Sequence, residues 1–200
     1  MVSFAGLERS PLAGLTTAGH YGAAASGLLI EERVDMAFAS VNARRDKRGA
    51  LVAAVDTAFG IALPDGPRRT GRAGVIFAGT GPGQWIASAE GTEAIGFATR
   101  LRARIAPFAA VTDQSDSRLV LRLSGPKLRH VLAKGVPIDL HPDVFRVGDV
   151  AVTLAAYIGV QIDRLDASTF QLTTPRSTAG SFWSWLSASA AEFGYDVVMK

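Results

Sequence analysis

The sequence predicts an α+β fold built from two related strand and helix halves. Of its 200 residues, 48% are hydrophobic and 20% are charged, which suffices for a sizeable buried core. Short segments with the two-residue alternation of strands are interspersed with segments of helical periodicity along most of the chain. We therefore expect a first half at 28–107 and a second half at 108–200. Residues 1–27, low in charge and rich in Gly and Ala, are expected to form a loosely ordered N-terminal arm.

The first half is expected to begin with one or two strands within residues 28–42. Leu51, Val52, Val55 and Phe59 then follow at helical spacing. Gly60 closes this pattern, as glycine does at many helix ends. A strand-to-helix unit is therefore predicted.

A glycine-rich segment, 79–83, separates two strand-like stretches at 75–77 and 85–87. Such a loop also suits a phosphate cradle. However, Gln84 stands where a dinucleotide-binding fingerprint needs glycine, and no Gly-Lys-Ser/Thr sequence follows. The preferred interpretation is the turn of a tight hairpin.

A longer helix is predicted after this hairpin, beginning at Ser88 or Glu90 and ending before Pro107. Its arginines lie mostly on one side, which is typical of an amphipathic surface helix. The apolar side is expected to face the core and comprises Ala94, Ile95, Ala98, Leu101 and Ile105.

The second half is expected to start with strands at 108–111 and 118–124. In the latter, Leu119, Leu121 and Leu123 share one face. Ser124 or Gly125 is predicted to cap a short helix that ends at Gly135, with Pro126 in its first turn.

The remaining chain predicts strands within 150–162 and 170–173 and a last amphipathic helix at 177–193. Trp183 and Trp185 project to different sides of that helix. We therefore predict that one of the two lies at a subunit interface, where aromatic residues are enriched, although packing of both in the core is the equal alternative.

Composition also bears on the class of protein. The net charge of +3, from 21 basic and 18 acidic residues, gives no basic surface of the kind that binds nucleic acid. The 200 residues contain no cysteine, which excludes thiolate metal sites and a cysteine nucleophile and fits a reducing compartment. No export signal or membrane-spanning segment is recognised, so a cytoplasmic protein is expected.

Few side chains in the sequence suggest chemistry. Asp139, His141 and Asp143 alternate as metal ligands can, but no fourth ligand is evident and a structural role is favoured. His141 also suits a base for Ser115 or Ser124, yet no Gly-x-Ser-x-Gly motif accompanies it. We expect no catalytic, cofactor-binding or metal-binding residue in this chain.

Two basic groups, at 44–48 and 68–72, each adjoin a predicted turn. They offer a weak indication of an acidic partner, because charge runs next to turns are usually solvated.

Five stretches resemble, in order and spacing, the gamma subunit family of heterotetrameric sarcosine oxidases, and the similarity extends over roughly residues 28–196. Two positions depart from the family pattern. Many members have cysteine at the position of Val136 and an acidic pair at the positions of Gly83 and Gln84. The stretches are VTDQSD at 111–116, LVLRLSGP at 119–126, VLAKG at 131–135, DLHP at 139–142 and FWSWL at 182–186.

This resemblance implies a fold like the folate-binding domain of the glycine-cleavage T-protein and a structural subunit without catalytic residues. Its partners would be alpha, beta and delta subunits that carry FAD, FMN, NAD and tetrahydrofolate. The complex would oxidatively demethylate sarcosine to glycine, giving hydrogen peroxide and either formaldehyde or 5,10-methylenetetrahydrofolate. The alternatives are a stand-alone folate-binding T-protein-like protein or aminomethyltransferase, and an unrelated adaptor.

Overall fold

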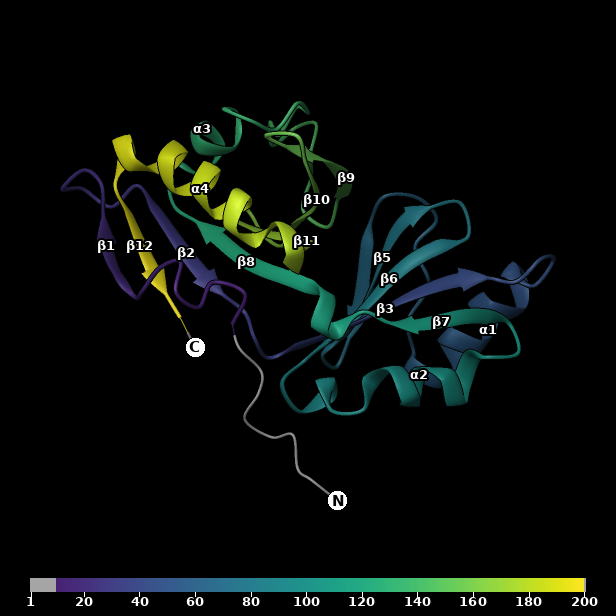
Figure 1. The fold of residues 1–200 in the computed structure, drawn as a ribbon. Helices are drawn as coiled ribbons and strands as arrows, with labels where there is room; N and C mark the ends of the chain where they lie inside the picture. Colours follow the sequence, from purple (N-terminus) through teal and green to yellow (C-terminus); the bar gives the residue numbers. More distant parts are fainter. Residues whose placement is uncertain (1–9, 200) are drawn as a thin grey trace, which may run out of the picture.

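The computed structural model describes residues 10–199 and arranges their strands in two sheets (Figure 1). The larger sheet has the strand order β1-β12-β2-β8-β11-β10-β9, and the smaller has the order β4-β5-β6-β3-β7. The strands are β1 Gly19–Tyr21, β2 Leu28–Glu32, β3 Met36–Ala43, β4 Arg69–Arg72, β5 Val75–Gly81, β6 Gln84–Glu90, β7 Ala109–Asp113, β8 Arg118–Ser124, β9 Val150–Ala155, β10 Ile158–Arg164, β11 Thr169–Pro175 and β12 Tyr195–Val198.

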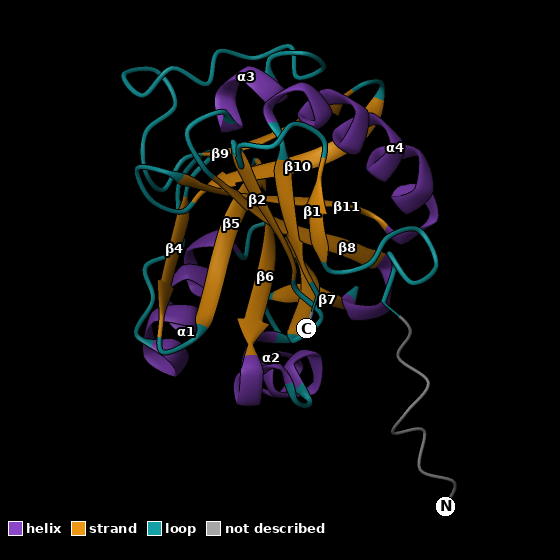
Figure 2. Ribbon diagram, turned by 90° about the vertical axis from the view of Figure 1, so that its left-hand side faces the viewer, coloured by secondary structure: helices purple, strands orange, loops and turns teal. Residues whose placement is uncertain are grey.

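Two helices accompany each sheet, and Figure 2 shows the two helix pairs at opposite ends of the molecule with the sheets between them. The α-helices are α1 Arg48–Phe59, α2 Phe97–Ile105, α3 Leu128–Leu132 and α4 Ala179–Ala190. Short 3-10 helices are η1 Gly91–Ala94, η2 Ser115–Ser117, η3 Arg176–Thr178 and η4 Ala191–Phe193. The mixed α+β class predicted from the sequence is confirmed.

The seven-stranded sheet packs one face against α3 and α4. Leu119, Leu121 and Leu123, which were predicted to share one face of β8, all point into this core and are fully buried. They meet Phe182 and Leu186 of α4 in one apolar cluster. The alternation of β8 therefore places its remaining side chains on the opposite face of the sheet.

The five-stranded sheet packs against α1 and α2 through a second core rich in alanine. Leu51 and Val55 of α1 are fully buried there, and the helix ends at Gly60 in the left-handed conformation, as expected. The predicted hairpin is β5–β6, in which Pro82 and Gly83 form the connection.

The chain crosses between the sheets twice, and the sheets therefore do not follow the sequence segments 28–107 and 108–200. β2 pairs with β8 and β12 in the larger sheet, whereas β3 starts only a few residues later in the smaller one. β7 pairs with β3, and the chain then returns to the larger sheet at β8. Each sheet thus contains strands from both segments.

The structure corrects the predicted start of the helix before Pro107. β6 continues to Glu90 because its backbone pairs with β3 as far as Met36, and α2 begins only at Phe97. Ile95 precedes α2 and is 75% exposed, so it does not belong to the buried face. Ala98, Leu101 and Ile105 do belong to it.

The expected capping by Ser124 or Gly125 is also wrong. Ser124 is still paired with Leu29 and Thr169 in the sheet, and α3 starts at Leu128 without a side-chain cap. Gly125 has φ +122°, and a Cβ there would lie 2.6 Å from the carbonyl oxygen of Gly27. The glycine is therefore needed for the close approach of two backbones.

The arm expected at residues 1–27 is partly ordered where it is described. Leu12 is fully buried in the larger core, and β1 pairs with β12. The burial of Leu12 and the pairing of β1 hold this part of the arm in place. The Gly/Ala-rich composition did not reveal either contact. Residues 1–9 lie outside the described part of the chain. No helix within residues 10–199 is long and apolar enough to span a membrane.

Candidate functional site

Each sheet and its two helices form one unit, and the two units meet at a junction between the sheets. This junction is formed largely by polar side chains. On β8, Arg118, Val120 and Arg122 alternate with the core leucines and so lie on the face opposite α3 and α4. Val120 packs against Met36 and Phe38 of β3 in a small apolar cluster that joins the two units.

At one end of this junction, two arginines converge on Glu90. Arg122 donates from Nη2 to Oε1 of Glu90 at 2.5 Å, and Arg33 donates from its Nη2 to Oε2 at 3.2 Å. Asp35 accepts two further hydrogen bonds from Arg33, both at 2.8 Å. The hydrogen bond to Asp35 raises the pKa of Arg33 above its ordinary value. These contacts link β6 of the smaller sheet to β8 and to the first crossover.

The junction also opens into a cleft of about 800 Å³, which Arg33 and Asp35 of this ion cluster help to line. Both crossovers border it, together with the segment that leads into α2. Arg118 lines this cleft and is partly buried. Burial lowers the pKa of Arg118 below its ordinary value, and no other cause contributes to that shift. Of the described residues, none is found to accept a hydrogen bond from its guanidinium or to form an ion pair with it.

A third polar contact places a carboxylate deep in the protein. Asp163 of β10 is 3% exposed and accepts a hydrogen bond from Gln161 at 2.8 Å. Arg69 of β4 approaches it from the other sheet with an N–O distance of 3.9 Å. Burial raises the pKa of Asp163 to about 6, because the hydrogen bond and Arg69 offset the loss of hydration only in part.

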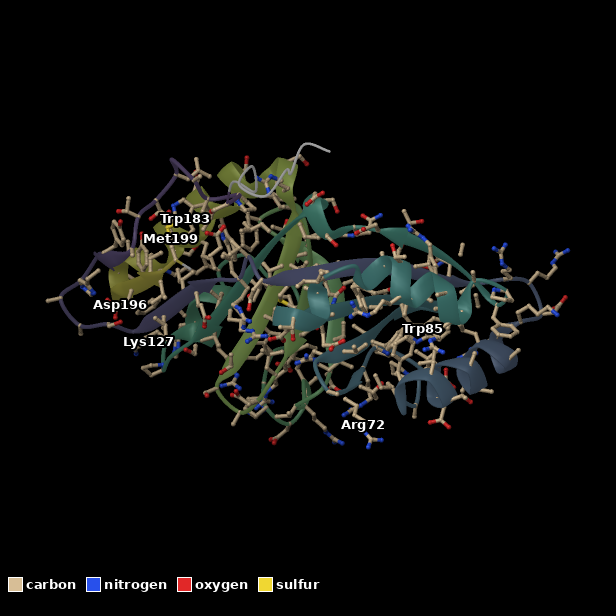
Figure 3. All side chains as sticks on the ribbon, turned by 90° about the horizontal axis from the view of Figure 1, so that it is seen from below. Arg72, Trp85, Lys127, Trp183, Asp196 and Met199 are labelled. Atoms are coloured by element: carbon tan, nitrogen blue, oxygen red, sulfur yellow. The ribbon has the colours of Figure 1, made fainter. Side chains whose placement is uncertain are left out.

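The two tryptophans proposed for an interface have different surroundings. Trp183 is 7% exposed and packs edge-on against Tyr195, and Figure 3 shows it beside Met199 in the half of the molecule away from Trp85. Trp185 is partly exposed and lies over Gly135, where a Cβ would be only 2.6 Å from its Nε1. Of the pair, Trp185 retains more surface for a partner.

The alternating polar side chains at 139–143 form a surface turn. Asp139 accepts a hydrogen bond from the backbone of His141 at 2.7 Å, and the His141 ring lies 3.5 Å from the Asp143 carboxylate. These contacts are local to the turn, and the structural role favoured for His141 stays a prediction. Within residues 10–199, no group of three or more acidic or histidine side chains is placed to hold a metal ion.

The other sequence candidates are also engaged within the chain. Ser115 donates to Asp113 at 2.7 Å and accepts from the backbone of Phe38, so it stabilises the second crossover. Among the basic groups, Arg48 pairs with Asp65 and Arg68 with Asp149.

The junction residues were missed by the sequence interpretation. A signal was present, because Arg118 and Arg122 recur on one face of a strand whose other face is leucine. Such a pattern normally indicates a solvated face. Only the packing of the second sheet against that face shows that Arg122 and Asp163 meet partners from the other sheet.

Comparison with known proteins gives consistent similarities. A model of the "Sarcosine oxidase, gamma subunit family" matches residues 44–192. A sarcosine oxidase subunit gamma from Arthrobacter sp. is 34% identical over 168 residues, which cover 82% of this chain and 80% of the relative. One from Corynebacterium sp. (strain P-1) is 30% identical over 203 residues, covering 99% of this chain and 97% of the relative.

Solved structures show the same fold. A chain of the heterotetrameric sarcosine oxidase from Corynebacterium sp. U-96, in complex with pyrrole 2-carboxylate, superposes with a TM-score of 0.80 and 28% identity. The match covers 94% of this chain and 96% of that one. The glycine cleavage system aminomethyltransferase T from Bartonella henselae gives a TM-score of 0.63 and 14% identity, covering 87% of this chain and 48% of that one, so it shares the fold alone.

Proposed function

Because this chain belongs to the sarcosine oxidase gamma subunit family, we propose that it is the structural subunit of a heterotetrameric sarcosine oxidase. The observation that carries the proposal is the superposition on a chain of such an enzyme, which is near-complete for both chains. The match to the aminomethyltransferase covers less than half of that enzyme. The alternative of a stand-alone folate protein therefore has weaker support.

In this proposal the partners are alpha, beta and delta subunits, and the complex works in the cytoplasm. FAD, FMN, NAD and tetrahydrofolate are held by the other subunits, which oxidise sarcosine to glycine. The present chain contributes a rigid surface, because its two sheets are coupled by the Glu90 ion cluster and the Val120 contacts. Rigid docking surfaces lose little conformational entropy when they bind.

Co-expression tests the proposal. The tagged chain is produced together with the three other subunits, and the eluted peak is examined by light scattering, absorbance and sarcosine-dependent peroxide formation. We expect one yellow, stoichiometric and active complex. A colourless monomer that binds tetrahydrofolate in calorimetry would contradict the proposal and favour the folate protein.

We further propose that the aromatic contact predicted from the sequence is made by Trp185. Trp183 is 7% exposed and packs against Tyr195, whereas Trp185 keeps part of its surface exposed. Trp185→Ala should weaken assembly by about tenfold or more, as loss of an interface tryptophan usually does. Assembly of the variant at wild-type affinity would show that Trp185 is not part of the interface.

A further inference from the structure

Arg118 differs from the other arginines of the junction in its electrostatic surroundings. Arg33 and Arg122 each meet carboxylates at hydrogen-bonding distance. Arg118 lies on the same face of β8 as Arg122, yet the described residues supply it with no ion pair. Arg118 is therefore a partly desolvated cation that lines an open cleft.

The acidic residues around this cleft are engaged elsewhere or are solvated. Asp35 is bonded to Arg33, and Asp113 accepts from Ser115. Asp116 is exposed to solvent. A guanidinium that loses water without gaining a partner destabilises the protein, and a carboxylate is the group that best compensates it because the two match in geometry.

Two of the exposed side chains that line the same cleft are apolar, and together they are called its apolar rim. Val34, in the first crossover, is 43% exposed, and Ile95, before α2, is 75% exposed. Apolar side chains around a central charge exclude water from it when another protein surface covers them. A small free anion would leave both side chains exposed, so the rim favours a protein as the source of the carboxylate.

We propose that this cleft is a docking site for a partner subunit, in which Arg118 receives the carboxylate of an Asp or Glu side chain while Val34 and Ile95 contact apolar groups around it. The inference rests on the proposed function and specifies where the subunit binds. No ion pair or hydrogen bond found within residues 10–199 uses the guanidinium of Arg118, and Val34 and Ile95 keep part of their apolar surface exposed.

Affinity measurements with matched variants test the docking site. The complex of the other three subunits is immobilised, and binding of the chain is followed by biolayer interferometry. Arg118→Met removes the charge but keeps an unbranched apolar side chain. We expect about 30-fold weaker binding or more, since one member of a buried charge pair is lost. Arg104→Met, at an exposed arginine of α2, is the control and should change the affinity by no more than about twofold.

The rim is tested by Ile95→Ser, which should weaken binding by about tenfold, because a buried apolar contact is lost. Wild-type affinity for both Arg118→Met and Ile95→Ser would overturn the inference. If the wild-type chain itself does not bind, the proposed function fails as well. These two failures are therefore distinguishable.

Thermal unfolding of the isolated chain separates docking from an internal role. Arg118→Met should leave Tm unchanged or raise it, because an unpaired charge is removed. If Glu8→Gln and Arg118→Met each lower Tm and their effects do not add, Glu8 of this chain supplies the carboxylate and the inference is wrong. Stabilisation of the wild-type chain by acetate over chloride at equal ionic strength, with unchanged assembly of Arg118→Met, would identify a free carboxylate and also overturn docking.

Discussion

The helix-covered cores and the junction between the sheets follow different rules of packing. In the cores, strand faces of Leu, Phe and Ala meet helices, and the side chains there are almost wholly apolar. At the junction, Arg122, Glu90, Asp163 and Gln171 are buried or partly buried between two sheets. The cores therefore depend on apolar burial, whereas the junction depends on the pairing of charges and hydrogen-bonding groups.

The largest effect is expected in a core. Trp183→Ala should lower the free energy of unfolding by about 4 kcal/mol, because it leaves a large cavity beside Tyr195. Urea unfolding followed by far-UV circular dichroism measures the change. A loss below about 1 kcal/mol would mean that the site collapses around the alanine, and that this part of the core is not closely packed.

A pH-dependent effect should mark the junction. The pKa of Asp163 is raised from 3.8 to about 6, so the folded state favours the protonated carboxyl. Below pH 4 the protonated Asp163 therefore adds about 3 kcal/mol to the free energy of unfolding. This contribution is lost as the pH rises through about 6. Asp163→Asn should therefore match the wild type near pH 4 and exceed its stability at pH 8.

The comparison of denaturation midpoints at the two pH values checks this. Gln161, which donates to Asp163, still finds an acceptor in the amide oxygen of asparagine. A variant that is less stable than the wild type at pH 8 would show that the Arg69 contact outweighs desolvation.

Removal of the shared carboxylate should have a smaller effect. Glu90→Gln keeps the size of the side chain but withdraws the charge that faces Arg33 and Arg122, and we expect a loss of about 2 kcal/mol. The value lies below that for a fully buried pair because Glu90 is 27% exposed. Glu93→Gln, at an exposed pair with Arg100, is the control and should have almost no effect. Equal stability of both variants would show that the Glu90 ion cluster does not stabilise the junction.

The smallest expected effect distinguishes two neighbouring threonines. The hydroxyl of Thr173 is buried and has no hydrogen-bond partner among the described residues, so Thr173→Val should stabilise the chain by about 1 kcal/mol. Thr174 donates to the carbonyl of Gly159 at 2.9 Å, and Thr174→Val should destabilise by a similar amount. Thermal unfolding of the two variants side by side tests the difference in sign.

The sequence predicted those parts of the fold in which local pattern and final environment agree. The buried leucines of β8, the β5–β6 hairpin and the glycine at the end of α1 are of this kind. It did not predict that β2 and β7 pair in opposite sheets, because strand pairing between distant segments leaves little trace in local periodicity.

The junction was missed for a related physical reason. Arg122 and Asp163 look like solvent-facing residues of half-buried strands, and only the second sheet reveals their partners. Trp185 was selected from its residue type and helical position, but its accessibility relative to Trp183 required the structure. The family resemblance identified the protein class without indicating which surface docks.

If this chain assembles as a subunit, the molar mass of the complex must include it. The 21.0 kDa chain is mixed with the three other subunits, and the product is measured by size-exclusion chromatography with light scattering. We predict one peak whose mass includes one copy of each of the four chains. An active oxidase that elutes without this chain, together with a separate 21.0 kDa peak, would contradict the account.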